Sequence, residues 1–410
     1  MNAIAAPTLY RDRDLNIFLG GRFLSTIATM VQSVAIGWQV YDIARDPLSL
    51  GLVGLSEFVP MFLLTLPAGY IVDRLGPRAV FAASLAAEAF CAAFLFGLAF
   101  EHVHRVWPLY VVLVLFGAAR GFSGPSSPSV LPFLVPPAIL PRAIAWSSSA
   151  SQVAVIAGPA FGGLLYALGA SVAYAFCGVA FLAAGVGISF LGGRRRVADG
   201  NKASALARVA EGIAYVRARP VVLGAISLDL FAVLLGGATA LLPIFARDIL
   251  HTGPIGLGIL RSATAVGAAA TAFALARRPL DRHAGHRMFA AVAVFGVATI
   301  IFGLSRNFLL TLAVLAVLGA SDMISVYIRS ALIQFATPDA MRGRVNSVSM
   351  LFVGASNELG AFESGVTASW FGTVPAVILG GIGTLAVVAI WMWLFPPLRT
   401  VDRLTDVEVP

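Results

Sequence analysis

The segment Gly69-Tyr70-Ile71-Val72-Asp73-Arg74-Leu75-Gly76-Pro77-Arg78 lies between two long apolar stretches. About half a chain later, Asp281-Arg282-His283-Ala284-Gly285 repeats its core with one inserted residue, and Arg287 follows. A glycine-rich run precedes each copy, Gly51-Leu52-Val53-Gly54 in the first half and Gly256-Leu257-Gly258 in the second. The offset is slightly over half of the 410 residues, which indicates a duplicated unit.

The composition predicts a membrane protein. Apolar residues make up 59% of the chain, charged residues only 12%, and the mean hydropathy is +0.89. A soluble protein of this length has roughly a quarter of its residues charged. A duplicated, strongly apolar chain with charged loops is typical of an alternating-access transporter, so we expect an all-α membrane protein that is not an enzyme.

Twelve stretches are long enough to cross a bilayer, which takes about 20 apolar residues. We predict transmembrane helices over residues 15–41, 48–72, 79–100, 107–134, 143–168, 171–192, 221–246, 254–276, 288–304, 307–335, 344–370 and 374–395. They form two pseudo-symmetric six-helix bundles, in residues 1–192 and 221–410. The cytoplasmic linker, residues 193–220, contains an amphipathic segment over 203–217 that we expect to lie along the membrane surface.

Basic residues predict the orientation. With the N-terminus inside the cell, the inner segments hold most of the arginines, including Arg194-Arg195-Arg196, and the outer segments hold only Arg45, Arg105, Arg247 and Arg306. This bias predicts that both termini are cytoplasmic. The net charge of +8 is then a signal of topology, and we expect no nucleic-acid partner.

The pattern formed by Gly69, Asp73, Arg74, Gly76 and Arg78 resembles the cytoplasmic hinge signature of the major facilitator superfamily. The resemblance covers the whole chain through its helix count, central linker and repeat, and it implies the major facilitator fold. A basic loop that serves only topology is the alternative. That role would explain the arginines but not the aspartate and the two glycines.

In that superfamily the hinge aspartate caps a helix of the opposite half and the hinge arginines bind acidic or carbonyl partners, which latches the outward-open state. A carboxylate at a helix N-terminus is stabilised by about 0.3–1 kcal/mol. The resemblance therefore implies that Asp73 faces the start of the eleventh helix, near Arg342 and Arg344.

The run Gly158-Pro159-Ala160-Phe161-Gly162-Gly163 in the predicted fifth helix resembles the core of the antiporter signature of the same superfamily, which is associated with exporters. Small residues permit close approach of helices, and the proline bends its helix. The full signature has a glycine where this chain has Ala154. Helix packing alone is the alternative role for this run.

Charged residues inside the predicted spans lie at two levels that bracket the centre. From helix direction and a rise of about 1.5 Å per residue, the inner third holds Arg22, Asp229 and Arg329. The outer third holds Glu57, Arg261 and Glu363, and nearer the middle lie Glu358, Asp322 and Arg120. The surroundings of Arg120 resemble a superfamily element whose arginine is linked to proton movement, with a structural salt bridge as the alternative.

The densest polar run inside any span is Ser356-Asn357-Glu358-Leu359-Gly360-Ala361-Phe362-Glu363. Its two glutamates are about 140° apart around a helix, so they do not face one ligand together. A carboxyl group removed from water in such a place is suited to carry a proton near neutral pH. We therefore expect Glu358, with Glu363 or Glu57 as the next candidates and Arg120 nearby, to couple transport to protons. Interhelical hydrogen bonding alone is the alternative.

The segment 37–73 and the run Thr337 to Val345 resemble the enterobactin-exporter branch of the superfamily. That branch implies proton-driven export of a siderophore across the inner membrane of a bacterium. In the superfamily the first, fourth, seventh and tenth helices line the central cavity, so Arg22 and Arg329 would bind an anionic substrate. Asp229 would neutralise one of them in an empty site, and Trp38 would supply an aromatic wall.

Other functions are possible for a membrane protein of this kind. A multidrug or macrolide exporter has the same architecture and is the nearest alternative. An importer is less compatible with the Gly158-Pro159 run, and a receptor or enzyme would need a cofactor site or a sensor domain. No phosphate-binding motif or metal-ligand spacing is present in the sequence, so we expect no cofactor and no metal. The expected partners are a small-molecule substrate, protons and the lipid bilayer, and we expect a monomer.

Overall fold

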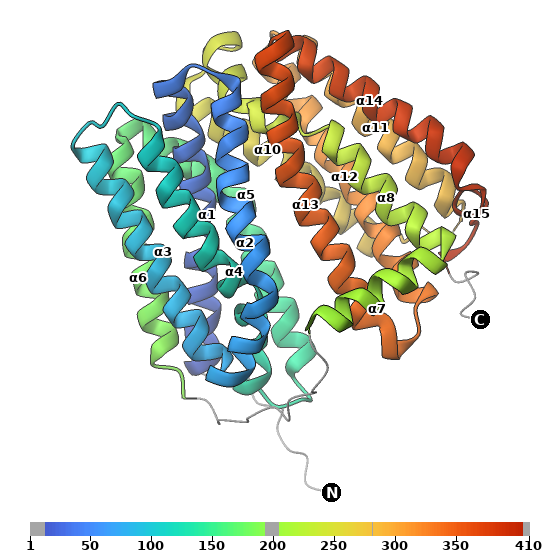
Figure 1. Cartoon of the computed structure of the whole chain (residues 1–410), viewed down its shortest axis with the longest axis horizontal. Coiled ribbons are helices and arrows are strands. Elements are labelled where there is room, and N and C mark those ends of the chain that lie inside the picture. Colours follow the sequence, from blue (N-terminus) through green and yellow to red (C-terminus); the bar gives the residue numbers. More distant parts are fainter. Residues whose placement is uncertain (1–12, 193–204, 281, 405–410) are drawn as a thin grey trace, which may run out of the picture. The chain divides into compact units, whose positions relative to one another are not determined.

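The computed structural model describes residues 13–192, 205–280 and 282–404, and every regular element in these ranges is helical. Figure 1 shows the helices in chain order. The first half of the chain forms α1 (Arg13–Ala44), α2 (Pro47–Leu75), α3 (Pro77–Phe100), α4 (Trp107–Leu134), α5 (Leu140–Leu168) and α6 (Ala170–Ser189).

The second half begins with α7 (Ala205–Ala218), which is the amphipathic helix of the linker. After it come α8 (Pro220–Leu235), η2 (Ala238–Leu241), α9 (Leu242–Ile244), η3 (Phe245–Ile249), α10 (Gly253–Arg277), α11 (Ala284–Leu304), α12 (Phe308–Ala336), α13 (Asp339–Phe371), α14 (Thr373–Leu394) and α15 (Pro396–Arg399).

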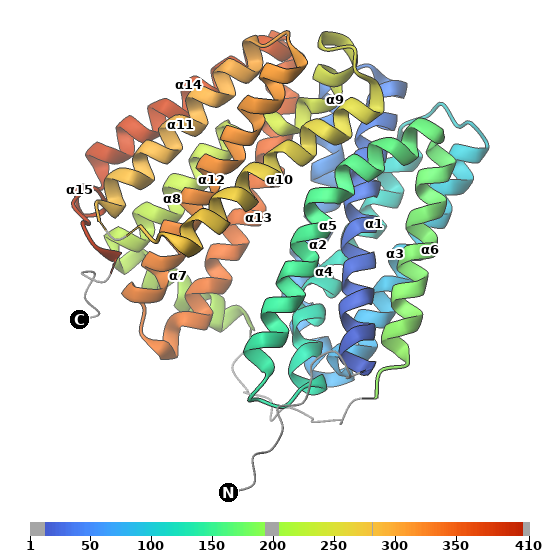
Figure 2. The ribbon, with the colours of Figure 1, turned by 180° about the vertical axis from the view of Figure 1, so that it is seen from behind.

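Helix packing repeats between the halves, as the internal repeat in the sequence predicts. In the first half α3 packs against α4 and α6, and in the second half its counterpart α11 packs against α12 and α14. Figures 1 and 2 show α3 beside α6 and α11 beside α14 from opposite sides. The duplication is therefore a duplication of the fold.

Eleven helical stretches within the described residues are long and apolar enough to cross a membrane, one fewer than the sequence predicted. The exception is the eleventh predicted span, which forms α13, a helix of 33 residues. Its length corresponds to about 50 Å. Its polar run, which includes Ser356, Glu358 and Glu363, lowers its hydropathy. That α13 crosses the membrane is therefore inferred from its length and from its place in the repeat.

The seventh predicted span, residues 221–246, is not one continuous helix. α8 ends at Leu235, and Gly236-Gly237 leads into a 3-10 turn, a short helix and the π-helical turn η3. A Cβ atom on Gly237 would lie 2.6 Å from the carbonyl oxygen of Gly360 in α13. The helix therefore breaks where two backbones approach too closely for any side chain.

Contacts divide the chain into two compact units. The first contains Met1–Ile36 and Val59–Lys202, and the second contains Gly37–Phe58 and Ala203–Pro410. The sequence assigned the first 192 residues to one bundle, whereas Gly37–Phe58, the end of α1 and the start of α2, groups with the second unit. The division therefore falls inside α1 and inside α2.

The core of the second unit lies between α8, α11, α12 and α14. Leu228, Met288 and Ile328 have no exposed surface there, and Val387 is 6% exposed. The chain after α14 adds Leu398, which is fully buried in the same cluster. The C-terminal segment is thus part of this core.

Candidate functional site

The hinge motif connects α2 to α3. Gly76 has a φ of +89°, a region in which a side chain is strained, so glycine is needed at this turn. Pro77 starts α3 at a position where its missing N–H group costs nothing. Asp73 and Arg74 are exposed, and no atom lies within 4 Å of a Cβ atom built on Gly69.

Arg78 binds the end of α6. Its Nε atom donates to the carbonyl oxygen of Ile188 at 3.2 Å, and a terminal nitrogen donates to the carbonyl oxygen of Ser189. A guanidinium group at a helix C-terminus binds free carbonyl groups and complements the helix dipole. Arg78 thus fixes the hinge to the first unit.

The two arginines at the start of α13 have partners within the second unit. Arg342 forms an ion pair with Asp339 at 2.7 Å, and Arg344 forms one with Glu211 of α7 at 2.7 Å. The pairing with Glu211 was not predicted. A contact of Asp73 with Arg342 or Arg344 would join the two units and remains a prediction.

The linker helix α7 packs against the end of α12 and the start of α13. The hydroxyl group of Tyr215 donates to the carbonyl oxygen of Ala336 at 2.7 Å. A Cβ atom on Gly212 would lie 2.9 Å from the carbonyl oxygen of Arg344. The linker therefore contacts the start of α13, the segment with Arg342 and Arg344 that the sequence predicted to take part in gating.

The second copy of the hinge is held by the C-terminal segment. Asp281 lies outside the described residues. The backbone nitrogen of His283 donates to Oδ1 of Asp402 at 2.8 Å. The backbone nitrogens of Ala284 and Gly285 donate to the carbonyl oxygens of Asp402 and Val401, each at 3.0 Å. The start of α11 is thus capped from within its own unit.

The glycines of the antiporter-like run bring α5 close to α1. A Cβ atom on Gly162 would lie 2.9 Å from the Cα atom of Val31, and one on Gly158 would lie 2.5 Å from the Cβ atom of Met30. Pro159 and Gly163 are buried in the same helix. The run therefore serves close packing of two helices, and any further role in antiport remains a proposal.

A buried ion pair connects α8 and α12. Arg329 pairs with Oδ2 of Asp229, and both side chains are only 6% exposed. The hydroxyl group of Ser325 lies 3.5 Å from Oδ1 of the same carboxylate. In the first unit, Arg22 of α1 donates to the hydroxyl group of Ser147 in α5 at 3.0 Å.

The glutamates of α13 have different surroundings. Glu358 lies against α2, because a Cβ atom on Gly54 would lie 2.9 Å from its Oε2 atom, and it interacts electrostatically with Arg261 of α10. Glu363 accepts a hydrogen bond from Thr367, one turn along its own helix, at 2.7 Å.

The remaining coupling candidates are half-buried. Glu57 on α2 belongs to the second unit with both α13 glutamates, and Arg120 on α4 belongs to the first unit.

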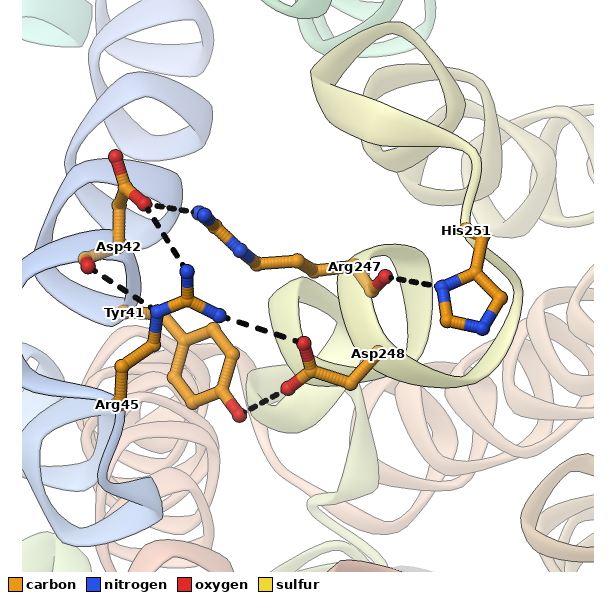
Figure 3. Close-up of polar contacts among 6 residues, drawn as sticks. All are labelled: Tyr41, Asp42, Arg45, Arg247, Asp248 and His251. Atoms are coloured by element: carbon orange, nitrogen blue, oxygen red, sulfur yellow. Dashed lines mark hydrogen bonds and ion pairs between the residues drawn. The ribbon is translucent and has the colours of Figure 1, made fainter.

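An ion-pair network joins the end of α1 to η3, as Figure 3 shows. Arg247 pairs with Asp42, while Arg45 lies 3.7 Å from Asp42 and 3.6 Å from Asp248. The hydroxyl group of Tyr41 donates to Asp248. Two acids and two bases thus balance each other at one end of the second unit.

Trp38 lies beside Arg247, one of the arginines of this network. The guanidinium group of Arg247 is 5.4 Å from the centre of its ring, within range of a cation–π interaction, and the ring is 8% exposed. From the sequence, Trp38 was predicted to form a wall of the substrate cavity, and Arg45 and Arg247 were predicted only as charges on the outer side. The signal in the sequence for this network is the opposite charge near each arginine, Asp42 and Asp248.

Comparison with known proteins identifies the family. The family model described as transmembrane secretion effector matches residues 14–407. The chain belongs to this family, within the major facilitator superfamily. It is therefore a membrane transporter and not an enzyme.

Two relatives carry names of exporters. The multidrug efflux pump Tap of Mycolicibacterium fortuitum is 26% identical over 398 residues, which cover 90% of this chain and 92% of the relative. The enterobactin exporter EntS of Citrobacter koseri is 25% identical over 391 residues, which cover 93% and 92%.

A solved structure shows the same fold. A bacterial homologue of the lysosomal transporter Spinster, in an inward-facing and occupied conformation, has a TM-score of 0.73 at 14% identity, over 96% of this chain and 97% of the other. At this identity the likeness supports the fold alone.

Proposed function

We propose that this transmembrane secretion protein is a proton-coupled exporter of a small anionic molecule, a siderophore, that works by alternating access across the bacterial inner membrane. The observation that carries the proposal is the buried ion pair between Asp229 and Arg329. A guanidinium group inside a membrane protein needs an anionic or polar partner, and Asp229 supplies one.

An anionic substrate has the chemistry to replace that partner. A carboxylate or catecholate oxygen of a metal-free siderophore accepts hydrogen bonds from a guanidinium group as Asp229 does. Arg22 is bound by the neutral hydroxyl group of Ser147 and keeps its positive charge for an anion. The resemblance to the enterobactin exporter favours this class of substrate.

Proton coupling rests on the acids of the second unit. Glu358 remains the first candidate because it interacts electrostatically with Arg261. Protonation of Glu358 would remove a negative charge that balances the guanidinium group of Arg261. Glu363 and Glu57 follow as alternative carriers, and Arg120 is the basic residue proposed to tune them.

Export of drugs is the second candidate, and the relationship to Tap supports it. The two functions differ in what Arg22 and Arg329 do. A siderophore exporter needs their charge for binding, whereas a pump for uncharged or cationic drugs binds mainly through apolar and aromatic surfaces.

Binding by the purified full-length protein distinguishes them. We would measure the affinity for iron-free enterobactin and for ethidium in Arg22→Gln and in the double variant Asp229→Asn/Arg329→Gln. The double variant avoids an unpaired buried aspartate, which would be strongly destabilising. Arg306→Gln, at an exposed position, is the control.

The proposal predicts that both arginine variants bind enterobactin at least about tenfold more weakly, a change of ~1.4 kcal/mol, while ethidium binding is unchanged. Unchanged enterobactin affinity in both would contradict the siderophore proposal and favour drug export.

The orientation and assembly belong to the same proposal. We propose that both termini face the cytoplasm and that the protein works as a monomer. The arginine-rich hinge and linker segments support this orientation. Labelling of single cysteines placed in the linker and beside Arg306 from each side of sealed vesicles would test it.

A further inference from the structure

A small cavity lies within the second unit, between α8, α11 and α12. The residues around it include Asp229, Asp322, Ser321 and Ser325. Its volume is about 10 Å³, close to the minimum that one water molecule needs.

Three of the polar residues share one face of α12. Asp322, Ser325 and Arg329 are spaced three and four residues apart, which places them within roughly 60° around the helix. A long side chain on a helix leans toward the N-terminus, so Arg329 extends toward Ser325 and Asp322. Asp322 interacts electrostatically with both Asp229 and Arg329.

The charges of this cluster do not balance. α8 contributes the carboxylate of Asp229, and α12 contributes the guanidinium group of Arg329 and the carboxyl group of Asp322. α11 contributes the apolar side chains of Val292 and Phe295. Two carboxylates and one guanidinium group leave one negative charge, which one proton would neutralise.

The position of Asp322 makes that charge costly. The residue is the midpoint of α12, fourteen residues from Phe308 and fourteen from Ala336. At about 1.5 Å per residue it lies roughly 21 Å from each end of the helix. An uncompensated carboxylate at such a depth costs about 2.5–3.5 kcal/mol or more.

We propose that Asp322 is a proton-binding residue of the transport cycle, which holds a proton while Arg329 is paired with Asp229. In the state of the transport cycle that opens this cluster to water, the proton leaves Asp322 for that water. The resulting carboxylate then competes with Asp229 for the unchanged guanidinium ion of Arg329. This assignment rests on the proposed proton-coupled export and adds to it a residue outside the coupling set of Glu358, Glu363, Glu57 and Arg120.

Transport by the reconstituted full-length protein tests the assignment. We would follow iron-free enterobactin and ethidium in proteoliposomes, uphill with an imposed pH gradient and by exchange without one, for Asp322→Asn and Asp322→Glu. Asp322→Asn should reduce uphill transport to the level of empty vesicles and leave exchange intact. Asp322→Glu should restore uphill transport with a shifted pH dependence.

A proton count gives a readout that needs no substrate. When unbuffered purified protein is titrated through neutral pH, Asp322→Asn should take up one proton fewer than the wild type, whereas Glu101→Gln, at an exposed position, should not differ in this range. This proton count also distinguishes a failure of the Asp322 assignment from a failure of the proposed export function. If wild-type protein transports neither probe uphill, the proposed function fails while the count still tests Asp322.

Three results would overturn the assignment. They are uphill transport by Asp322→Asn under a pH gradient, an unchanged proton count in that variant, and a wild-type protein driven by a sodium gradient whose sodium dependence Asp322→Asn abolishes. If Asp322→Asn does not fold, an unshifted pH dependence in Asp322→Glu contradicts the proposal in its place.

Discussion

At the scale of single residues, glycines set how closely the helices of this transporter approach. Gly162 of α5 faces Val31 of α1 so closely that a Cβ atom would lie 2.9 Å from a Cα atom, and backbone cannot yield as a flexible side chain does. Gly124 of α4 has no atom within 4 Å of the same position. Gly162 is therefore needed for close packing of two helices, whereas the position of Gly124 has room for a side chain.

This difference gives a paired prediction. Gly162→Ala should destabilise the protein by about 1–3 kcal/mol because the added methyl group overpacks the contact between α1 and α5. Gly124→Ala should be neutral or stabilise by up to about 1 kcal/mol, because alanine favours a helix more than glycine does. Thermal unfolding of both variants in detergent measures the effect. Equal melting temperatures would contradict the packing role of Gly162.

A second residue prediction concerns coupling. A glutamine in place of Glu358 cannot carry a proton, so Glu358→Gln should lose uphill export while substrate exchange across vesicles continues. Glu101→Gln, an exposed carboxyl group outside the spans, is the matched control and should behave as wild type. If Glu358→Gln still pumps uphill under a proton gradient, Glu363 becomes the leading candidate in α13.

At the scale of elements, the hydropathy of long stretches predicted the helices well but did not predict where they are interrupted. Eleven predicted spans correspond to apolar helical stretches because hydropathy over about 20 residues is a strong signal. The break at Gly236-Gly237 depends on the approach of Gly360, a residue more than a hundred positions away. No local pattern contains that information.

The sequence predicted the charged residues of the candidate site but not all of their partners, because a partner from a distant segment leaves no local pattern. The charged residues inside the spans were found from their positions in the sequence. The sequence predicted that Asp229 would neutralise either Arg22 or Arg329, and the structure pairs it with Arg329. The partners of Arg344 and Arg247 were not found, because Glu211 and Asp42 lie in segments where charges are ordinary. Their roles depend on tertiary contacts.

The ion-pair network between α1 and η3 is expected to hold these two elements together. Exposed ion pairs contribute about 0.2–1 kcal/mol each, and several in one network add up. The double variant Asp42→Asn/Asp248→Asn should therefore loosen the contact of Gly37–Phe58 with the rest of the second unit. Hydrogen exchange should rise in residues 37–58 and 245–251.

The matched control is Arg105→Gln, an exposed arginine on the loop after α3. It should leave exchange in both segments unchanged. If the double variant also shows wild-type exchange there, apolar packing and not the ion pairs holds this end of the unit together.

At the scale of the whole molecule, alternating access requires contacts that form in one state and break in another. We predict that Asp73 forms such a contact with the start of α13 in the outward-open state. Asp73→Asn should keep wild-type expression and lose most transport, because an amide lacks the negative charge that favours a helix N-terminus. Transport in vesicles, normalised to the amount of protein, is the measurement.

The arrangement of charges in the hinge offers an internal comparison. Arg78 is bound to carbonyl groups of α6 within its own unit, whereas Asp73 is exposed. Arg78→Gln should therefore lower thermal stability, whereas Asp73→Asn should change transport without lowering stability. Normal transport by Asp73→Asn would contradict the latch.

For the molecule as a whole, we propose that a proton gradient drives the export of an anionic siderophore. The most direct measurement is the movement of iron-free enterobactin across proteoliposomes that contain the purified protein, with and without an imposed pH gradient. We expect accumulation against the enterobactin gradient only when the pH gradient is present, and its collapse when a protonophore is added. Accumulation that does not depend on the pH gradient, or active ethidium transport without any enterobactin movement, would contradict the proposed function.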